Sequence, residues 1–323
     1  ATLVFSYIGM QTQELKVNSR TGMLNVTMLD DSQMIDDVVV VAYGVRKKGT
    51  IAGSVSTVKS EKLENVPTAS FDQALQGQTP GLTVMAASGE PSRAATFQIR
   101  GTNSINSGTT PLFILDGVPV ESSSFNSISP SDIESISVLK DASSTSIYGA
   151  RAANGVVVIT TKRGRNVGDA NVTFRGQWGF SQLAGSNWDM MNTAERIQYE
   201  KEIGLDLGEE YYDKVKGIDV NWMDEVFNNN APTQSYELAV NGATEKTNYY
   251  VSGGFFDQDG ITFGSSFRRY NVRANVENRA KEWLKLGTST MLAYQETQQA
   301  VDGDYAIYAP ISASHFMLPY WNP

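Results

Sequence analysis

The strongest constraint in this sequence is a strict alternation of apolar and polar residues that begins after residue 170. In the first alternating segment, one face carries all of the large apolar side chains: Val172, Phe174, Trp178 and Phe180. A period of two is typical of a β-strand whose two faces meet different environments. The pattern returns around Leu238, around Val272 and between residues 283 and 294. The second half of the chain is therefore predicted to form about five strands.

The length of these segments favours a membrane protein. Each runs for about ten residues, which is the length of a tilted strand that crosses a bilayer, whereas strands of soluble proteins usually have about five or six. Their connections alternate between tight (242–246 and 278–282) and long (183–232), as in outer-membrane barrels, and 257–266 is predicted to be a short external loop. A large soluble β-sandwich can show the same alternation and stays as the alternative.

The stretch from residue 51 to residue 162 has a mixed pattern that predicts a compact α+β domain. Its strand candidates are residues 81–85, 96–100, 112–115 and 156–161. Its helix candidates are residues 70–75 and a segment after Asp141, whose carboxylate suits a helix cap. Before this domain, residues 3–7, 14–17 and 24–28 are predicted to be strands at the end of a small β-domain.

Composition excludes several classes of protein. The 35 acidic residues outnumber the 26 basic ones, and a net charge of -9 argues against nucleic-acid binding. The chain contains no cysteine, which excludes disulfides and thiolate sites within it. No apolar run approaches the roughly 18 residues of a membrane-spanning helix, and the sequence begins without the apolar segment of a signal peptide.

A run of four valines follows an acidic linker near the start of the chain. Asp36 and Asp37 precede residues 38–41, and Ala42 and Tyr43 follow them. An extended β-branched segment is suited to adding a strand to the sheet edge of a partner, because backbone hydrogen bonds then supply the affinity. The alternative is a buried strand of the preceding domain.

Longer motifs then relate the chain to a known family. Residues 137–164 read SVLKDASSTSIYGARAANGVVVITTKRG, and residues 247–260 read TNYYVSGGFFDQDG. Before both of them stand DDVVVVAYG at 36–44, ALQGQTPGLTV at 74–84, IRGTNS at 99–104 and FILDGVPV at 113–120. In all of these segments the chain resembles the SusC/RagA group of TonB-dependent outer-membrane transporters. The resemblance implies an α+β plug domain followed by the first antiparallel strands of a large transmembrane β-barrel.

The resemblance also implies how the chain is divided. Residues 1–30 would be the end of a carboxypeptidase-regulatory-like β-domain, 31–48 a linker with the TonB box, 49–166 the plug, and 167–323 the first about five barrel strands and their loops. Barrels of this kind have about 22 strands around a plugged lumen. Since an open sheet edge in lipid leaves backbone groups unsatisfied, we expect the chain to be a fragment that lacks both ends.

The first set of candidate site residues is the TonB box, the segment that the energy transducer TonB grasps in this family. The resemblance assigns it to Asp37, Val38, Val39, Val40, Val41, Ala42 and Tyr43. Force on this segment would remodel part of the plug and open a path through the barrel.

The second set lies in the loops of the plug. Polar side chains there are candidates to face the lumen and hydrogen-bond a sugar or peptide substrate, with ordinary loop solvation as the alternative: Asn103, Ser104, Asn106, Ser123 and Asn126. The glycine-rich stretch 142–155 lacks the spacing of a phosphate-binding loop, and Gly149 and Gly155 are expected to serve tight packing. The cations Arg100, Arg151 and Lys162 are expected to pair with carboxylates of the barrel wall.

No catalytic centre, metal site or cofactor is predicted. His315 is the only histidine, and the acidic pairs Glu209 with Glu210 and Asp302 with Asp304 do not form a complete ligand set. An enzyme such as a glycoside hydrolase is therefore the weakest alternative, after an exported soluble β-rich binding or adhesion protein.

The leading hypothesis is TonB-dependent active import of an oligomeric nutrient, a glycan or a peptide, across the outer membrane. The partners that the resemblance implies are TonB, a SusD-like lid lipoprotein, the oligosaccharide or peptide substrate and outer-membrane lipid, with a dimer of transporter–lid pairs. A helical segment at residues 193–203, inside the long loop, is expected to face the lid.

Overall fold

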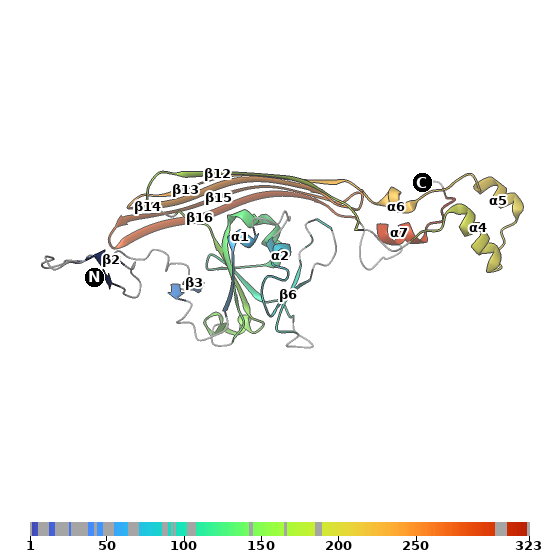
Figure 1. The fold of residues 1–323 in the computed structure, drawn as a ribbon. Helices are drawn as coiled ribbons and strands as arrows, with labels where there is room; N and C mark the ends of the chain where they lie inside the picture. The colour runs from blue at the N-terminus through green and yellow to red at the C-terminus, as the bar shows by residue number, and fades with distance from the viewer. Residues whose placement is uncertain are drawn as a thin grey trace.

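The computed structural model describes most of the chain. The described residues are 2–5, 13–16, 26, 38–41, 44–47, 55–63, 71–85, 90–91, 93, 95–101, 108–141, 145–164, 167–184, 189–300 and 309–321. They form a long curved sheet, a smaller domain packed against one of its faces, and a group of helices beyond one end of its strands (Figure 1). The predicted α+β domain followed by long antiparallel strands is confirmed.

The smaller domain, which we call the plug, is built on a mixed five-stranded sheet. Its strand order is β5 (Val55–Lys59), β10 (Ile133–Leu139), β11 (Val156–Thr161), β8 (Leu112–Leu115) and β9 (Val118–Val120). The central strands β10 and β11 are antiparallel to each other, and β11 is parallel to β8. Four consecutive residues of β11, Val156–Ile159, are buried, and β10 buries Ile133, Ile136, Val138 and Leu139, as expected for strands covered on both faces.

A tight hairpin joins β8 to β9. Asp116 and Gly117 occupy the two turn positions with φ of 48° and 92°. Two successive positive φ values identify the turn type that an Asp-Gly pair favours, because glycine has no Cβ and aspartate tolerates the left-handed region. The hairpin therefore follows from two adjacent residues, and it leaves the Asp116 carboxylate at the end of the sheet.

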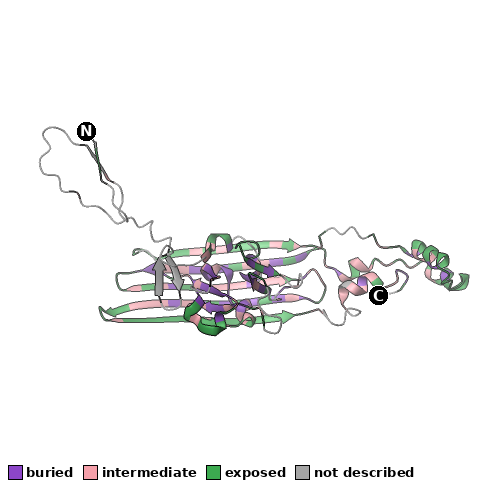
Figure 2. Cartoon of the chain, turned by 90° about the horizontal axis from the view of Figure 1, so that it is seen from below, coloured by how far each residue is buried: buried purple, intermediate pink, exposed green. Residues whose placement is uncertain are grey.

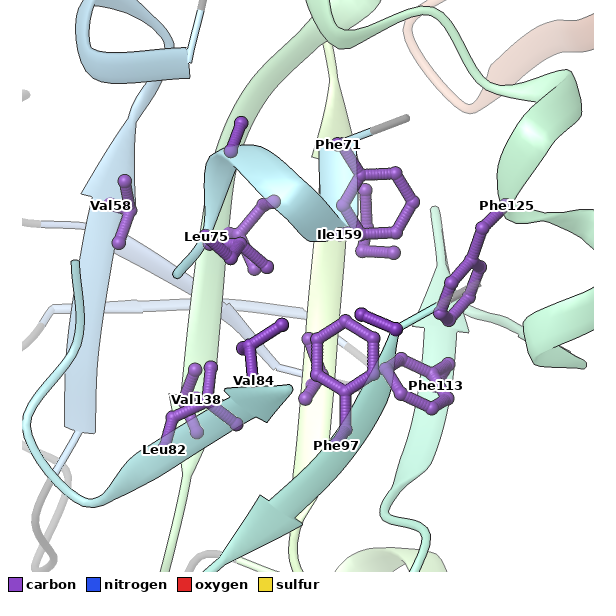
Figure 3. Close-up of a cluster of buried hydrophobic side chains, with 14 of the residues drawn as sticks. Val58, Phe71, Leu75, Leu82, Val84, Phe97, Phe113, Phe125, Val138 and Ile159 are labelled. Carbon is purple, nitrogen blue, oxygen red and sulfur yellow. The ribbon is translucent and has the colours of Figure 1, made fainter. Parts of the chain in front are cut away.

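Aromatic rings fill the plug core on one side of this sheet. Phe97 and Phe125 each contact Phe113, with ring centroids 5.0 and 4.5 Å apart, and Phe71 contacts Phe125 at 4.8 Å (Figure 3). They come from the helix α2 (Phe71–Ala74), the strand β7 (Thr96–Ile99), β8 and the 3-10 helix η3 (Ser122–Ser127). Burying one such ring contributes about 1.5–3 kcal/mol, so this cluster joins segments that are distant in sequence.

Several short elements complete the plug. The hairpin of β6 (Leu82–Met85) and β7 is separate from the main sheet, and helix α1 (Ser60–Leu63) follows β5. The 3-10 helices η4 (Pro130–Asp132) and η5 (Ser146–Ala152) lie before β10 and before β11. The predicted strands 112–115 and 156–161 match β8 and β11 residue for residue.

The long sheet, which we call the wall, has five antiparallel strands in chain order. They are β12 (Asn171–Ser181), β13 (Ala231–Ala243), β14 (Thr247–Asp259), β15 (Ser266–Lys281) and β16 (Leu284–Gln298). The five predicted strands are confirmed, and all five are longer than the ten residues expected. The tight turns at 244–246 and 282–283 lie at one end, and the long loop 182–230 lies at the other.

The polarity of the two faces of the wall is the reverse of that in a soluble protein, because the face that packs against the plug is polar and the face away from it is apolar. On β15 the polar residues Arg269, Asn271 and Arg273 are buried against the plug, whereas the alternating Tyr270 and Val272 are exposed. The buried residues of the wall gather beneath the plug (Figure 2). A polar face toward the plug and an apolar face away from it are typical of a barrel wall in lipid.

Helices pack together beyond the long-loop end of the wall. They are α4 (Thr193–Glu202), α5 (Glu209–Val215), α6 (Trp222–Val226) and α7 (Pro310–Phe316). A capping box begins α4, since Asn192 Oδ1 accepts from the Glu195 backbone and Glu195 Oε2 accepts from the Asn192 backbone. The predicted helix at 193–203 is confirmed.

Two small hairpins precede the plug. Strand β1 (Thr2–Phe5) pairs with β2 (Gln13–Lys16), and β3 (Val38–Val41) pairs with β4 (Gly44–Lys47). The strand predicted at 24–28 lies outside the described residues except for Val26. Within the part of the chain that the structure describes, no helix has the length and apolar character needed to cross a membrane.

Candidate functional site

The plug meets the wall through one end of its central sheet. Because β11 is parallel to β8 and antiparallel to β10, the last residues of β8 and β11 lie beside the first residues of β10. This end carries Asp116, Asp132 and Thr161, and it contacts inward-facing side chains of β14, β15 and β16. We call it the docked end of the plug sheet. The side chains of β14 and β15 that face the plug are buried although they are polar: Tyr250, Ser252, Arg273 and Asn275.

Asp116 is the centre of the first contact. Its carboxylate accepts hydrogen bonds from the backbone and the hydroxyl of Thr161, at 3.0 and 2.6 Å, and from Arg273 Nη2 at 2.6 Å. Arg273 also donates to Ser289 Oγ at 3.2 Å. The Asp116–Arg273 ion pair therefore joins the plug to the wall across residues 157 positions apart in the chain.

The Asp116–Arg273 ion pair is buried, which makes it costly to separate. The side chains of Arg273 and Asp116 are 2% and 8% exposed. Taking two charges out of water is costly, and the cost is offset only when both charges are paired and hydrogen-bonded. Removal of either partner leaves the other charge buried in the interface without a counter-charge. The pair can therefore hold the plug against the wall, whatever its net contribution to stability.

Asp132 is the centre of the second contact, and its wall partners there are neutral groups. Its carboxylate accepts from Tyr250 Oη at 3.0 Å and from Ser252 Oγ at 2.5 Å, both on β14. The backbone carbonyl of Asp132 accepts from the Lys162 backbone at 2.9 Å, which connects this contact to the end of β11. Asn275 then donates to the Lys162 carbonyl at 2.7 Å and to Thr161 Oγ1 at 3.0 Å.

Arg269 holds the loop around η3 against the wall. Its guanidinium donates to the backbone carbonyls of Asn126 and Ile128, at 3.0 and 3.5 Å, and lies over the ring of Phe256 at 5.5 Å. Asn126 is thus in contact with the wall through its backbone, and its side chain is half-buried. Ser123 on the same helix is exposed. The other candidate substrate-facing residues, Asn103, Ser104 and Asn106, lie outside the described residues, and the contact of this set with substrate stays a prediction.

The chain leaves the plug by passing very close to the wall. A Cβ added at Gly164 would lie 2.1 Å from the carbonyl oxygen of Gly242 and 2.4 Å from the backbone nitrogen of Tyr249. Only glycine allows this approach. A cavity of about 210 Å³ lies next to it, lined by polar residues that include Arg163, Asn248, Asn275 and Glu277.

The opposite end of the plug sheet, which we call the far end, makes different contacts. Arg100 pairs there with Asp141 at 2.6 Å, and Lys140 Nζ donates to Ser56 Oγ at 2.7 Å and to the Pro80 carbonyl. Partial burial, with the nearby Arg100 charge, lowers the pKa of Lys140. Lys140 thus ties β5 and the start of β6 to the end of β10.

These contacts correct one prediction about the plug cations. Arg100 pairs with a plug carboxylate and not with the wall, so the prediction is wrong for this residue. The buried ion pair between the two domains has the reverse polarity, because the wall supplies the arginine and the plug supplies the aspartate. The side chain of Arg151 is exposed, and Lys162 contacts the wall through its backbone carbonyl.

The glycines of the stretch 142–155 have two separate roles. Gly155 has a φ of 92°, and a Cβ there would lie 2.7 Å from Ile99 Cδ1 and 3.2 Å from the Leu139 carbonyl, so tight packing is confirmed. At Gly149 the surrounding space is open, and the expectation of tight packing is wrong. Its φ of 68° and ψ of -158° lie in a region that only glycine commonly occupies.

The candidate coupling segment is extended, as predicted for its valine run. Val38–Val41 forms β3, and its residues pair with Gly44–Lys47 in a register that places Val38 opposite Lys47. Asp37, Ala42 and Tyr43 lie outside the described residues. Within the described residues, β3 pairs with the strand that follows it and not with β1 or β2 of the preceding segment. Its role in coupling stays a prediction.

The remaining chemical candidates have ordinary partners. Glu209 and Glu210 pair with Lys201 and Lys214 on the helix surface, and Ser314 Oγ lies 3.2 Å from His315 Nδ1. Asp302 and Asp304 lie outside the described residues. In the described part of the chain, no three histidine, aspartate or glutamate residues gather as a metal site.

The residues that join the two domains were not predicted as site residues from the sequence. Asp116 stands in a recognised motif and Arg273 on a recognised strand, but neither was singled out. The available signal was the row of large polar residues at alternate positions of β15, which in lipid must face a polar partner. Its partner could not be read from the sequence.

Comparisons with known proteins agree with this architecture. A family model described as the TonB-dependent receptor plug domain matches residues 47–156. TonB-dependent receptor P26 of Formosa agariphila is 35% identical over 306 residues, which cover 93% of this chain and 31% of that protein. TonB-dependent receptor SusC of Bacteroides thetaiotaomicron is 32% identical over 339 residues, which cover 99% of this chain and 33% of that protein.

Solved structures show the same likeness. The RagAB peptide importer in its open-open state aligns with a TM-score of 0.80 and 34% identity, over 88% of this chain and 35% of that chain. Its closed-closed state aligns with a TM-score of 0.76 over 85% of this chain. The present chain spans about a third of the length of the curated relatives that it matches.

Proposed function

The chain belongs to the SusC/RagA-type TonB-dependent receptors, which are not enzymes, and we propose that it contributes the coupling segment, plug and first wall strands of a nutrient importer. The transporter would sit in the outer membrane and import an oligomeric substrate, a glycan or a peptide. TonB would supply the energy by pulling on the segment around Val38–Val41. The proposed division of the chain is a β-domain end at 1–30, the linker at 31–48, the plug at 49–166 and the wall from 167.

The observation that supports this mechanism is the contrast between the two ends of the plug sheet. The docked end is held to the wall by buried side chains of β14 and β15, and the exposed Ser289 of β16 lies 3.5 Å from Asp116. At the far end, Arg100 pairs with Asp141 and Lys140 donates to Ser56, and all four residues belong to the plug. The chain that comes from the coupling segment enters the sheet at the far end, because Val55 of β5 pairs with Leu139 of β10.

This topology makes β5 the element that a pull would move first. In the described sheet β5 is an edge strand whose single neighbour is β10. A pull that arrives at Val55 would load the Val55–Leu139 pair before the Lys59–Ser135 pair, so the pairs would open one after another. Opening in sequence needs less force than breaking all pairs together. Besides the backbone pairs, the side-chain contacts Lys140–Ser56 and Thr57–Ser137 would resist this opening.

The docked end would stay in place during this movement. Residues at the ends of β8, β10 and β11 each contact the wall there. The plug would therefore open by detachment of its edge strand β5, and the rest of the plug would stay in the barrel. The vacated space would lie inside the plug, and a polar oligomer would pass beside the remaining strands.

The helices beyond the strand ends would form the external side of the transporter. Tyr320 donates to the buried Glu200 at 2.9 Å, and Trp222 Nε1 donates to the Leu318 carbonyl at 2.9 Å, so two segments distant in sequence form one platform. Burial, with the hydrogen bond to Glu200, raises the pKa of Tyr320, so this bond persists at neutral pH. A SusD-like lid lipoprotein would dock on this platform, in a dimer of transporter–lid pairs.

The first test concerns the coupling segment. Residues 38–41 of the full-length protein are replaced by a Gly-Ser segment of the same length, which removes the β-branched strand without shortening the linker. We expect substrate binding to be unchanged and energised uptake to be lost. Equal replacement of residues 44–47 is the matched control. Uptake that survives replacement of 38–41 would exclude this segment as the site of coupling.

The second test concerns the movement of β5. Thr57 and Ser137 are paired, and their hydroxyl oxygens lie 3.1 Å apart, so cysteines at both positions are placed to form a disulfide. We expect oxidation of the Thr57→Cys/Ser137→Cys protein to block uptake and reduction to restore it. The control is Ser137→Cys/Val158→Cys, which joins β10 to β11 and should leave uptake intact. Transport at the normal rate by the oxidised first variant would show that β5 does not separate.

A further inference from the structure

Arg273 is the wall residue that holds Asp116, and its guanidinium is only partly satisfied. A guanidinium carries five N–H groups, and each requires an acceptor when the side chain is buried. Nη2 donates to Asp116 at 2.6 Å and to Ser289 Oγ at 3.2 Å. Nε is buried and has no hydrogen-bond partner among the described residues. The strong acceptors of this buried cation are therefore confined to Nη2.

The remaining nitrogen, Nη1, faces a methionine. Met291 lies directly opposite Arg273 in the pairing of β15 with β16, and its Sδ is 3.7 Å from Nη1. A thioether sulfur is a weak acceptor, so it uses little of the hydrogen-bonding capacity of a cationic nitrogen. A stronger acceptor at this position would form a charge-assisted hydrogen bond with a charge that is already buried.

Met291 also connects the wall to the apolar interior of the plug. Its side chain is partly buried and packs against the cluster of buried residues that includes Phe113 and Phe125. One side chain thus contacts both the cation of the docked ion pair and the plug core. A chemical change at its sulfur would act directly on the contact between plug and wall.

Solvent reaches this region through the polar cavity beside Gly164. Asn275 and Ser289 belong to the lining of the cavity, and Ser289 is itself a partner of Arg273. The lining also includes Arg163 and Glu277, whose side chains are 55% and 39% exposed. Water and small solutes in the cavity therefore come within one side chain of the Arg273–Met291 contact.

We propose that Met291 is an oxidation site, and that its sulfoxide strengthens the attachment of the plug to the wall. Hydrogen peroxide transfers one oxygen atom to the sulfur, the O–O bond breaks, and water leaves. The thioether is thereby oxidised and the peroxide reduced, and sulfoxide reductases reverse the change.

The new oxygen is a strong acceptor within reach of Arg273 Nη1. Arg273 keeps Asp116 through Nη2 and gains a partner through Nη1, so the buried cation is better satisfied. Because the oxygen faces the guanidinium, it is not left unpaired against the plug core. This inference concerns the contact between plug and wall, and it does not depend on what the protein imports.

The test compares oxidised and reduced forms of the full-length protein. Hydrogen peroxide is the oxidant, and peptide mass spectrometry measures sulfoxide at Met291, with Met85, which is 48% exposed, as the internal reference. Urea-dependent proteolysis of the plug measures the equilibrium constant for plug opening. We expect oxidation to lower this constant about fivefold, as one hydrogen bond to a charged group would, and reduction by sulfoxide reductases to restore it.

Two variants isolate residue 291 from the other methionines. Met291→Leu keeps an apolar side chain that cannot be oxidised, so its opening constant should be the same before and after peroxide. Met291→Gln places an amide oxygen near Arg273 and should resist opening more than Met291→Leu without any oxidant.

An opening constant that stays the same or rises on oxidation of the unsubstituted protein would overturn the proposal, and so would an equal decrease in Met291→Leu. A Met291 that remains a thioether after Met85 is fully oxidised would show that the oxidant does not reach it, which also overturns the proposal. A Met291→Gln protein no more resistant than Met291→Leu would exclude the contact with Arg273 as the cause. None of these outcomes bears on the proposed import, because uptake is not measured.

Discussion

An arginine–aspartate pair lies at each end of the plug sheet, with the same closest distance between nitrogen and oxygen. At the docked end Arg273 lies 2.6 Å from Asp116, and at the far end Arg100 lies 2.6 Å from Asp141. The two pairs differ in burial. Arg273 and Asp116 are 2% and 8% exposed, whereas Arg100 and Asp141 are 52% and 28% exposed.

The N–O distance alone therefore does not determine how much free energy is needed to break an ion pair. An exposed pair is screened by water and typically contributes about 0–1 kcal/mol, so it can break and re-form as the plug moves. A buried pair cannot lose one partner without leaving a charge in a dry interface, which costs about 3–5 kcal/mol. The pair that joins the plug to the wall is therefore expected to be much more costly to break than the pair within the far end of the plug.

The largest expected effect comes from breaking the docked pair. Arg273→Met in the full-length protein leaves Asp116 buried without its cation and should lower the free energy of plug unfolding by about 3–5 kcal/mol. Urea-dependent proteolysis of the plug measures this value. The double variant Asp116→Asn/Arg273→Met should recover a large part of the loss. An effect of Arg273→Met no larger than that of Arg100→Met would refute the comparison.

A second prediction concerns the packing of the far end. Gly155→Ala should cost about 3 kcal/mol, because positive φ and contact with Ile99 and the Leu139 carbonyl oppose the new methyl group together. Gly149→Ala is the matched control, with backbone strain but open space around it, and should cost about 1–2 kcal/mol. Urea unfolding of the two variants compares them, and equal losses would mean that packing at Gly155 is unimportant.

A third prediction separates the two contacts of the docked end. Asp132→Asn keeps an acceptor for Tyr250 and Ser252, and the nearby buried Arg269 keeps its hydrogen bonds to backbone carbonyls, so the change should cost about 1–2 kcal/mol. This is less than the loss expected for Arg273→Met. The same proteolysis experiment ranks them, and a larger loss at Asp132 would make it the principal attachment.

The smallest effect is expected at Lys140. Lys140→Met removes the hydrogen bond to Ser56 near the surface and should lower stability by at most about 1 kcal/mol. Its consequence should instead be local, with faster amide hydrogen exchange in β5 than in β11. Uniformly faster exchange across the plug would argue that Lys140 supports the whole sheet and not its edge alone.

Local signals in the sequence were sufficient for most of the fold. The strands β8 and β11 were predicted at their observed boundaries because they are short apolar, β-prone runs. The helix at 193–203 was predicted from Ala194, Ile197 and Tyr199 among charged residues, which are close together in sequence. The wall was predicted from its period of two, and its lipid-facing side from the apolar half of that period.

The sequence by itself determined which segments are strands, which wall face is apolar and where the tight turns lie, because residues a few positions apart decide these properties. Only the tertiary structure decided that Arg273 meets Asp116, that Arg269 holds the η3 loop and that Arg100 stays within the plug. These contacts join residues up to 157 positions apart. Their identity depends on which end of the plug sheet faces the wall, and the order of strands in space, not a local pattern, decides it.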